Sequence, residues 1–225
     1  MDDVPHAEMG KFMSPKEQNY ENLAEGIIEK LAHRNMEGYY CKDREEANAK
    51  AKRFLTPDCS ISWGGSETIK EIGLLDDLLE AEGEYELFDR TKPHPGMTDK
   101  EIYEKMVTAD FFLMSTNAIT MDGELVNIDG NGNRVACLCN GPSNVIIIAG
   151  MNKVVPDVKS GIARVQNIAA PPNAVRLQTN TPCMEYGRCT ECLADGCMCC
   201  HTVVTRMSRT PGRIKVILVG EELGY

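Results

Sequence analysis

The stretch NVIIIAG, residues 144–150, is the segment that decides the fold of this chain of 225 residues. It is a continuous apolar run and does not alternate with polar residues. Strands have this pattern when both faces of their sheet are buried, as in parallel sheets covered by helices. We therefore expect a central strand of a mostly parallel sheet at this position.

Short β-rich segments alternate with helical ones on either side of this strand. Such alternation is typical of βα units. The expected strands are 59–63, 85–89, 110–116, 144–150, 201–207 and 213–220, and the expected helices are 20–31, 43–54, 67–80, 98–109 and 155–169. The fold class predicted from these elements is α/β.

Two further segments complete the organisation of the chain. The stretch 119–136 alternates apolar and polar residues around two Gly-containing turns, which predicts an antiparallel hairpin inserted into the fold. The sequence APPN, residues 170–173, is expected to end the preceding helix. We expect residues 1–18 to form a mobile tail and residues 19–225 to form one domain.

Composition and the N-terminal sequence limit the location and the partners of the protein. The N-terminus lacks the basic and apolar regions of a signal peptide, and no apolar stretch is long enough to span a membrane, so we expect a cytoplasmic protein. With 24 basic and 34 acidic residues the net charge is -10, which argues against nucleic acid as a partner. In a reducing compartment, clustered cysteines favour metal or redox chemistry over disulfides.

Residues 181–201 form a cysteine-rich segment that predicts a metal site. Cys189 and Cys192 are separated by two residues, a spacing that lets both sulfurs reach one centre. With Cys183 and Cys199 they give a four-thiolate set, and the alternates are Cys197, Cys200 and His201. The spacing matches neither a zinc ribbon nor the usual ferredoxin run. We favour a [4Fe-4S] cluster, with zinc as the alternative.

Polar residues at the predicted carboxyl edge of the sheet form a candidate anion site. The turn Gly64-Gly65-Ser66 lies between a strand and a helix, where backbone N–H groups can bind an anion. The alternative is a capped turn with no ligand. We assign a small anionic ligand to this turn together with Thr68, Asn117 and Asn152.

Two candidate catalytic residues accompany this turn. Glu124 lies beside a hairpin turn and could act as base or nucleophile, as could the nearby Asp129, and Lys153 could act as an electrostatic partner. The alternatives are solvated surface carboxylates and a surface lysine. Cys137 and Cys139 lie on an apparent strand and are interpreted as core residues.

Several stretches together resemble one protein family. These are SWGGSETIKEIGL, TNAITMDGELVNIDGNGNRVA, IAGMNKVV, the TPC and CTEC elements, and GRIKVILVGEELGY. Over roughly residues 18–225 the chain resembles the LUD, or lactate-utilisation, domain family, in the branch with a cysteine-rich C-terminal segment. The resemblance implies a three-layer α/β fold similar to the phosphosugar-isomerase and CoA-transferase superfamily.

The resemblance also implies a role in metabolism. It suggests an iron-sulfur subunit or accessory factor in the oxidation of L-lactate to pyruvate, working with other iron-sulfur proteins. A transferase- or isomerase-like enzyme, or an anion-binding module with a structural metal, is the competing hypothesis. The expected partners are a small anionic metabolite and those iron-sulfur proteins, with no membrane span, and a homo-oligomer stays open.

Overall fold

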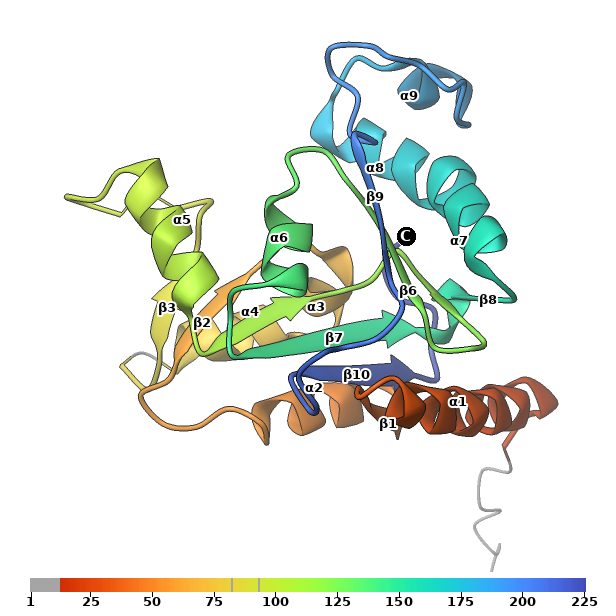
Figure 1. Ribbon diagram of the computed structural model, residues 1–225, viewed down its shortest axis with the longest axis horizontal. Coiled ribbons are helices and arrows are strands. Elements are labelled where there is room, and N and C mark those ends of the chain that lie inside the picture. Colours follow the sequence, from red (N-terminus) through yellow and green to blue (C-terminus); the bar gives the residue numbers. More distant parts are fainter. Residues whose placement is uncertain (1–12, 82, 93) are drawn as a thin grey trace, which may run out of the picture.

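The predicted central strand is β7 (Asn144–Gly150) of a six-stranded sheet in the computed structural model, which describes residues 13–81, 83–92 and 94–225 (Figure 1). All neighbouring strands of this sheet are parallel. In sheet order they are β1 (Glu37–Cys41), β10 (Ile214–Val219), β7, β4 (Phe111–Met114), β2 (Ser60–Trp63) and β3 (Glu86–Phe88). The parallel α/β prediction is confirmed.

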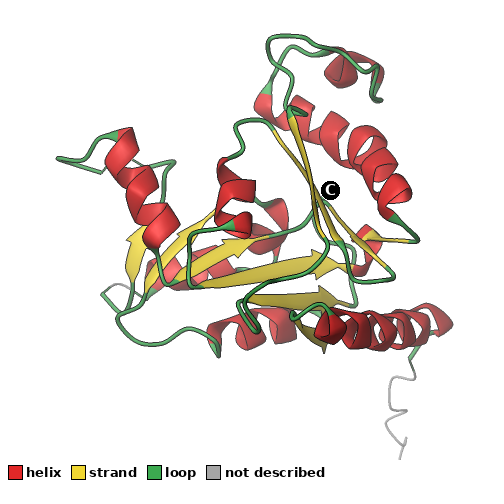
Figure 2. Ribbon diagram, in the orientation of Figure 1, coloured by secondary structure: helices red, strands yellow, loops and turns green. Residues whose placement is uncertain are grey.

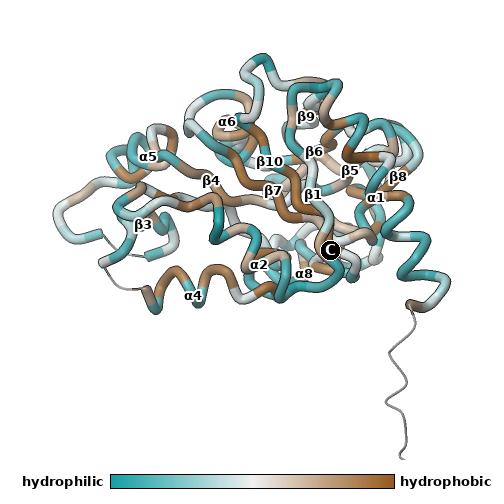
Figure 3. Tube along the Cα trace, turned by 90° about the horizontal axis from the view of Figure 1, so that it is seen from below, coloured by the Kyte–Doolittle hydropathy of each residue, from teal (hydrophilic) through white to brown (hydrophobic). Residues whose placement is uncertain are grey.

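Helices cover both faces of the parallel sheet and give the fold its three layers. Successive residues of β7 point to opposite faces, and both Ile147 and Ile148 are fully buried, each in a different apolar cluster. The helices on one face are α1 (Pro15–His33), α5 (Asp99–Thr108) and α6 (Asn133–Cys139), and those on the other are α2 (Arg44–Lys52), α3 (Glu67–Glu71) and α4 (Leu74–Glu80). Figure 3 shows the apolar character of the strands between them.

The predicted hairpin is confirmed and belongs to a second, four-stranded sheet. β5 (Ala118–Thr120) and β6 (Leu125–Asp129) pair antiparallel, β8 (Val154–Val155) joins β5, and β9 (His201–Thr205) joins β6. A long helical segment packs on this sheet and consists of α7 (Val158–Arg164), a π-helical turn (Val165–Ala169) and α8 (Ala170–Leu177). Figure 2 shows that the cysteine-rich segment above α8 is mostly loop, with one short helix, α9 (Pro182–Tyr186).

Two element predictions are wrong in this C-terminal half. The APPN sequence does not end the helix, because Pro171 and Pro172 lie in the first turn of α8, where a missing N–H is tolerated. Cys137 and Cys139 lie on α6 and not on a strand, and only Cys137 is buried. Arg213 donates three hydrogen bonds to carbonyls at and just beyond the end of α6 and so stabilises this short helix.

The N-terminal half differs from the prediction in three details. α1 begins at Pro15 after a capping box between Ser14 and Glu17, so residues 15–18 are helical, while residues 1–12 of the expected tail lie outside the described residues. The helix expected over 67–80 is divided at Gly73, whose φ of 73° lies in the left-handed region. β1 was not predicted. Within residues 13–81, 83–92 and 94–225, no helix is long and apolar enough to cross a membrane.

Candidate functional site

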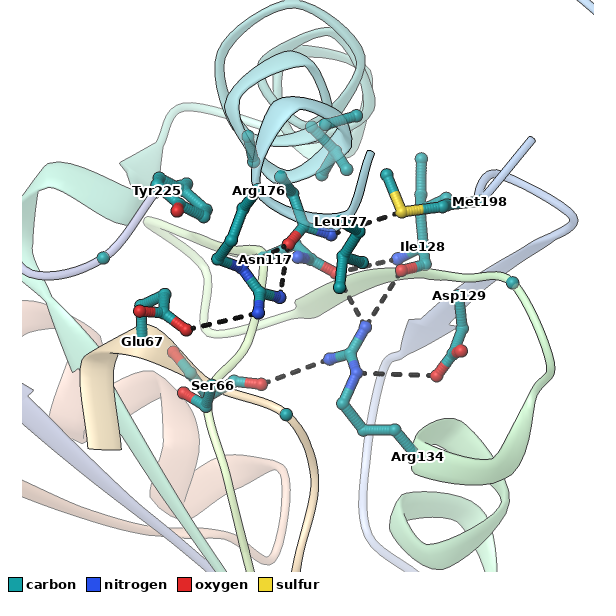
Figure 4. A pocket seen from close by; sticks show the side chains of 18 of the residues that line it. Ser66, Glu67, Asn117, Ile128, Asp129, Arg134, Arg176, Leu177, Met198 and Tyr225 are labelled. Carbon is teal, nitrogen blue, oxygen red and sulfur yellow. Dashed lines mark hydrogen bonds and ion pairs between the residues drawn. The ribbon is translucent and has the colours of Figure 1, made fainter. Parts of the chain in front are cut away.

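A polar pocket of about 370 Å³ lies at the carboxyl edge of the parallel sheet. It is lined by residues 65–68 after β2, by Ser115, Thr116 and Asn117 after β4, and by Lys153 after β7. Figure 4 shows Ser66, Glu67 and Asn117 among them. The opposite wall comes from the end of β6, from α8 and from the cysteine-rich segment. Open parallel sheets bind ligands at this edge. We call this cavity the polar pocket.

Lys153 is the buried basic group of this pocket. Only 4% of the residue is exposed, so the alternative of a surface lysine is wrong. Its Nζ donates to Thr68 Oγ1 at 2.8 Å and to Ser115 Oγ at 3.0 Å. Burial lowers the pKa of Lys153 to about 7; Arg164 and Arg134 add to the lowering and Glu71 opposes it. An amine with this pKa is largely neutral at physiological pH or slightly above it.

Arg134 holds the pocket wall together through its guanidinium. Its Nη1 donates to Asn127 Oδ1 at 2.6 Å. Its Nη2 donates to Asn117 Oδ1 at 2.9 Å (Figure 4). It also donates to the carbonyls of Ser115 and Ile128, and its Nε lies 3.5 Å from Asp129 Oδ2. Because these partners occupy the guanidinium, Arg134 positions the wall and keeps few donors for a ligand.

Two other arginines lie at the pocket. Arg176 Nη1 is 3.5 Å from Glu67 Oε1, so α8 and α3 are linked across the pocket (Figure 4). Arg90 also lines the pocket and is exposed, and no ion pair to it occurs among the described residues. Arg90 is therefore a cation available to a ligand.

Most predicted anion-site residues and one predicted catalytic residue do line the polar pocket. The anion-site residues are Gly65, Ser66, Thr68 and Asn117, and the catalytic residue is Lys153. Ser66 Oγ accepts a hydrogen bond from Ile69 N at 3.3 Å, so this side chain caps its own helix, which is the alternative we considered. Asn117 uses its Oδ1 for Arg134 and for Ile128 N, whereas its Nδ2 has no partner among the described residues.

Three predicted residues lie outside the lining of the polar pocket. Gly64 packs on the stem of Arg134, and Asn152 bonds to the backbone of Leu223. Glu124 lies on the β5–β6 turn, where it contacts Thr120 and lies 3.7 Å from Arg34 at the end of α1. The reason is that a hairpin turn need not face the carboxyl edge of the parallel sheet. Asp129, at the end of β6, does line the pocket.

The cysteine-rich segment surrounds a second cavity of about 230 Å³, which we call the cysteine pocket. All four predicted ligands and one alternate line it, namely Cys183, Cys189, Cys192, Cys199 and Cys197. The alternates Cys200 and His201 do not. Gly187, with a φ of 66°, ends α9, and Gly196 lies so close to the Thr179 carbonyl that a side chain there would clash.

The thiols of the cysteine pocket lie near one another without converging on a point. Burial raises the pKa of the Cys199 thiol to about 12, and Cys197, Cys189 and Cys183 add to the rise because neighbouring thiolates repel. Among the described residues, however, no three His, Cys, Asp or Glu side chains converge as a single metal ion requires.

The two pockets share a wall. Met198 and Cys199 line both of them, as does Ala170 at the start of α8. The cysteine-rich segment is anchored there, because Cys200 N donates to the Asp129 carbonyl at 3.1 Å. A ligand in the polar pocket would therefore lie next to whatever the cysteine pocket holds.

Sequence reasoning missed Ser115, Arg134, Arg90 and Arg176. Ser115 directly follows a buried strand, as Lys153 follows β7, so the same sequence signal could have identified it. Arg134 was missed because its segment was interpreted as part of the hairpin, whereas this segment forms the start of α6. Arg90 and Arg176 carry no local pattern, since only the folded chain brings them to the pocket.

Fold and site together define an α/β protein with a metabolite-sized polar pocket at a parallel sheet edge and a cysteine-lined pocket beside it. Residues 24–219 match the LUD domain, and the chain belongs to this family of lactate-utilisation proteins. A crystal structure of a DUF162 family protein from Deinococcus radiodurans is 14% identical, with 92% of this chain and 99% of that chain covered and a TM-score of 0.48. A search of curated proteins finds no match.

Proposed function

We propose that the protein is an iron-sulfur subunit or accessory factor in the oxidation of L-lactate to pyruvate. It binds a small carboxylate in the polar pocket and carries a [4Fe-4S] cluster in the cysteine pocket. The observation that carries this proposal is the shared wall, in which Met198 and Cys199 line both cavities. A substrate pocket that adjoins a cluster site suits electron transfer over a short distance.

We favour a cluster over a zinc ion in the cysteine pocket. Four sulfurs bound to one zinc ion at about 2.3 Å must converge closely, which the described thiols do not do. In a cubane cluster each cysteine binds a different iron, so the sulfurs surround a larger volume. Cys183, Cys189 and Cys192 with either Cys199 or Cys197 are the proposed ligands.

The polar pocket offers what a small carboxylate needs in a chain with a net charge of -10. Arg90 is an available cation, and Asn117 Nδ2 is an available donor. Lys153 adds an amine that changes charge near neutral pH. We place the carboxylate among these groups, beside Gly65, where no atom lies within 4 Å of the position that a side chain would take.

When bound, the cluster would supply one-electron transfer, so the two electrons of lactate oxidation must pass on to partner proteins. The chain itself binds and orients the carboxylate. Leu193, within the cysteine-rich segment, is 99% exposed, and Tyr186 of α9 is 62% exposed. Exposed apolar side chains beside the cluster site support contact with an iron-sulfur partner.

Protein purified without oxygen tests this proposal. We expect a brown sample with about four irons per chain and a broad absorption band that dithionite bleaches. Cys139→Ser serves as control, because Cys139 is exposed on α6 outside the cysteine pocket and its loss should leave the iron content unchanged. A colourless protein with one zinc per chain would contradict the proposal.

The second candidate is a transferase- or isomerase-like enzyme with a structural metal. Buried Lys153, with its pKa near 7, favours this candidate, because such an amine can act as base or nucleophile without redox chemistry. Turnover of a sugar phosphate or a CoA thioester by the zinc-loaded protein would favour it over the first.

A further inference from the structure

The amine of Lys153 is held in the polar pocket in an arrangement suited to attack on a bound ligand. Lys153 follows β7, and its Nζ lies between the hydroxyls of Thr68 and Ser115 at 2.8 and 3.0 Å. These hydroxyls come from α3 and from the end of β4. Among the described residues, no carboxylate forms an ion pair with this amine, so no negative charge in direct contact favours its charged state.

The charged groups around Lys153 also favour its neutral form. Arg164 on α7 and Arg134 on α6 oppose a further positive charge, and Glu71 on α3 favours it. Burial has the largest effect, and the resulting pKa of Lys153 is about 7. A neutral amine has a free electron pair and is a nucleophile, whereas an ammonium group is not.

We propose that Lys153 is the nucleophile that forms a covalent imine with the carbonyl carbon of a small 2-oxo acid bound in the polar pocket. The inference rests on the proposed function in one respect, since pyruvate is the 2-oxo acid that lactate oxidation produces. It adds a covalent step and a catalytic residue to that function.

The step balances without an oxidant or a reductant. The Nζ electron pair forms a bond to the carbonyl carbon, and one amine proton moves to the carbonyl oxygen to give a carbinolamine. Addition of one further proton to this hydroxyl group lets it leave as water and gives a protonated imine, whose nitrogen still carries the second amine proton, and release of that proton gives the neutral imine. Thr68 and Ser115, both within hydrogen-bond distance of Nζ, can relay these protons.

The choice of a 2-oxo acid follows from the other groups of the pocket. A carbonyl compound with a carboxylate on the neighbouring carbon can use the amine and a cation at the same time. Arg90 supplies a cation without an ion-pair partner among the described residues, and Asn117 Nδ2 supplies a donor. A neutral aldehyde would leave Arg90 without a role.

Reductive trapping tests the inference on protein purified without oxygen. We expect pyruvate with sodium cyanoborohydride to add, at one site per chain, the mass of pyruvic acid less one oxygen atom, and peptide mapping to locate it at Lys153. Lys153→Met should abolish the adduct, and Lys159→Met, which removes an exposed lysine of α7, should not. The trapping rate should rise with pH in the range near pH 7, where Lys153 loses its proton. An exposed lysine would show this rise only near its ordinary pKa of about 10.4.

Mapping of the unaltered chain needs no variant, so the test stands even if Lys153→Met fails to fold. An absence of label on Lys153, or equal label on exposed lysines and in Lys153→Met, would overturn the inference. A purely structural lysine would lower stability when replaced but would never carry the label. Four irons without an adduct would contradict this inference alone, and an adduct without iron would contradict the proposed function alone.

Discussion

In the polar pocket several side chains lie at strand ends and are fixed by hydrogen bonds, whereas in the cysteine pocket Cys183 lies on a five-residue helix and the other thiols lie on loops. Arg134 joins the ends of β4 and β6 through Ser115, Asn127 and Ile128. Folding of the two sheets therefore fixes these parts of the first pocket. Three thiols of the second pocket form hydrogen bonds with residues only two positions away in sequence, and we expect bound metal to fix the geometry of this pocket.

The largest expected effect is loss of the metal from the cysteine pocket. Cys189→Ser and Cys192→Ser should each lose most of the iron, because both thiols line this pocket. Cys200→Ser, a change directly after a proposed ligand but outside the pocket, should keep it, as should Cys137→Ser and Cys139→Ser. Iron analysis of the purified variants checks this. Equal iron in all five would show that the ligands are elsewhere.

The next effect concerns the network that holds the polar pocket. Arg134→Met leaves Asp129, which is only 10% exposed at its side chain, without its partner, and it should lower the free energy of unfolding by about 3 kcal/mol. Arg176→Met is the matched control, since Arg176 lines the same pocket and pairs with Glu67 near the surface; it should cost at most about 1 kcal/mol. Urea unfolding measures both. Equal losses would mean that Arg134 is no more important than a surface arginine.

A smaller effect is expected for ligand affinity at Gly65. The backbone φ of Gly65 is not positive, and no atom beyond the neighbouring residues lies within 4 Å of the position that a Cβ would take. Gly65→Val should therefore fold without strain and extend into the pocket. Affinity for pyruvate or lactate should fall about tenfold, or about 1.4 kcal/mol. Calorimetric titration of wild type, Gly65→Ala and Gly65→Val measures it. Unchanged affinity in Gly65→Val would show that the ligand does not bind at this turn.

The smallest effect is the pH dependence that Lys153 gives to stability. Its pKa is about 7 in the folded chain, below the usual value of 10.5, so the unfolded state binds more protons between these values. The free energy of unfolding of wild type, relative to Lys153→Met, should therefore rise by about 1 kcal/mol from pH 7.5 to 8.5. Urea unfolding at both pH values checks it. A difference that is flat or falls with pH would show that this lysine stays charged.

The two regions also differ in how far the sequence predicts them. Lys153 was found because it follows a buried parallel strand, and the chain direction then fixes which edge it reaches. Glu124 was misplaced because the turn of a hairpin obeys no such rule. Arg134 was missed because seven residues are too few to separate a helix from a strand by periodicity.

For the cysteine-rich segment the sequence identified candidate ligands, but spacing alone could not rank them. Cys197 and Cys200 both lie within two residues of Cys199, and only the folded chain shows that Cys197 lines the cavity while Cys200 does not. The contact between the two pockets is likewise a tertiary feature. Met198 and Asp129 are far apart in sequence, and pairing of β9 with β6 brings their segments together.

The central claim is that the two adjoining pockets work as one site, and electron paramagnetic resonance of the dithionite-reduced protein tests it most directly. Spectra are recorded with and without saturating pyruvate, in wild type and in Gly65→Val. The account predicts a cluster signal whose g values shift when pyruvate binds to wild type and do not shift in Gly65→Val. A cluster signal that is identical with and without pyruvate, while calorimetry shows the pyruvate bound, would contradict it.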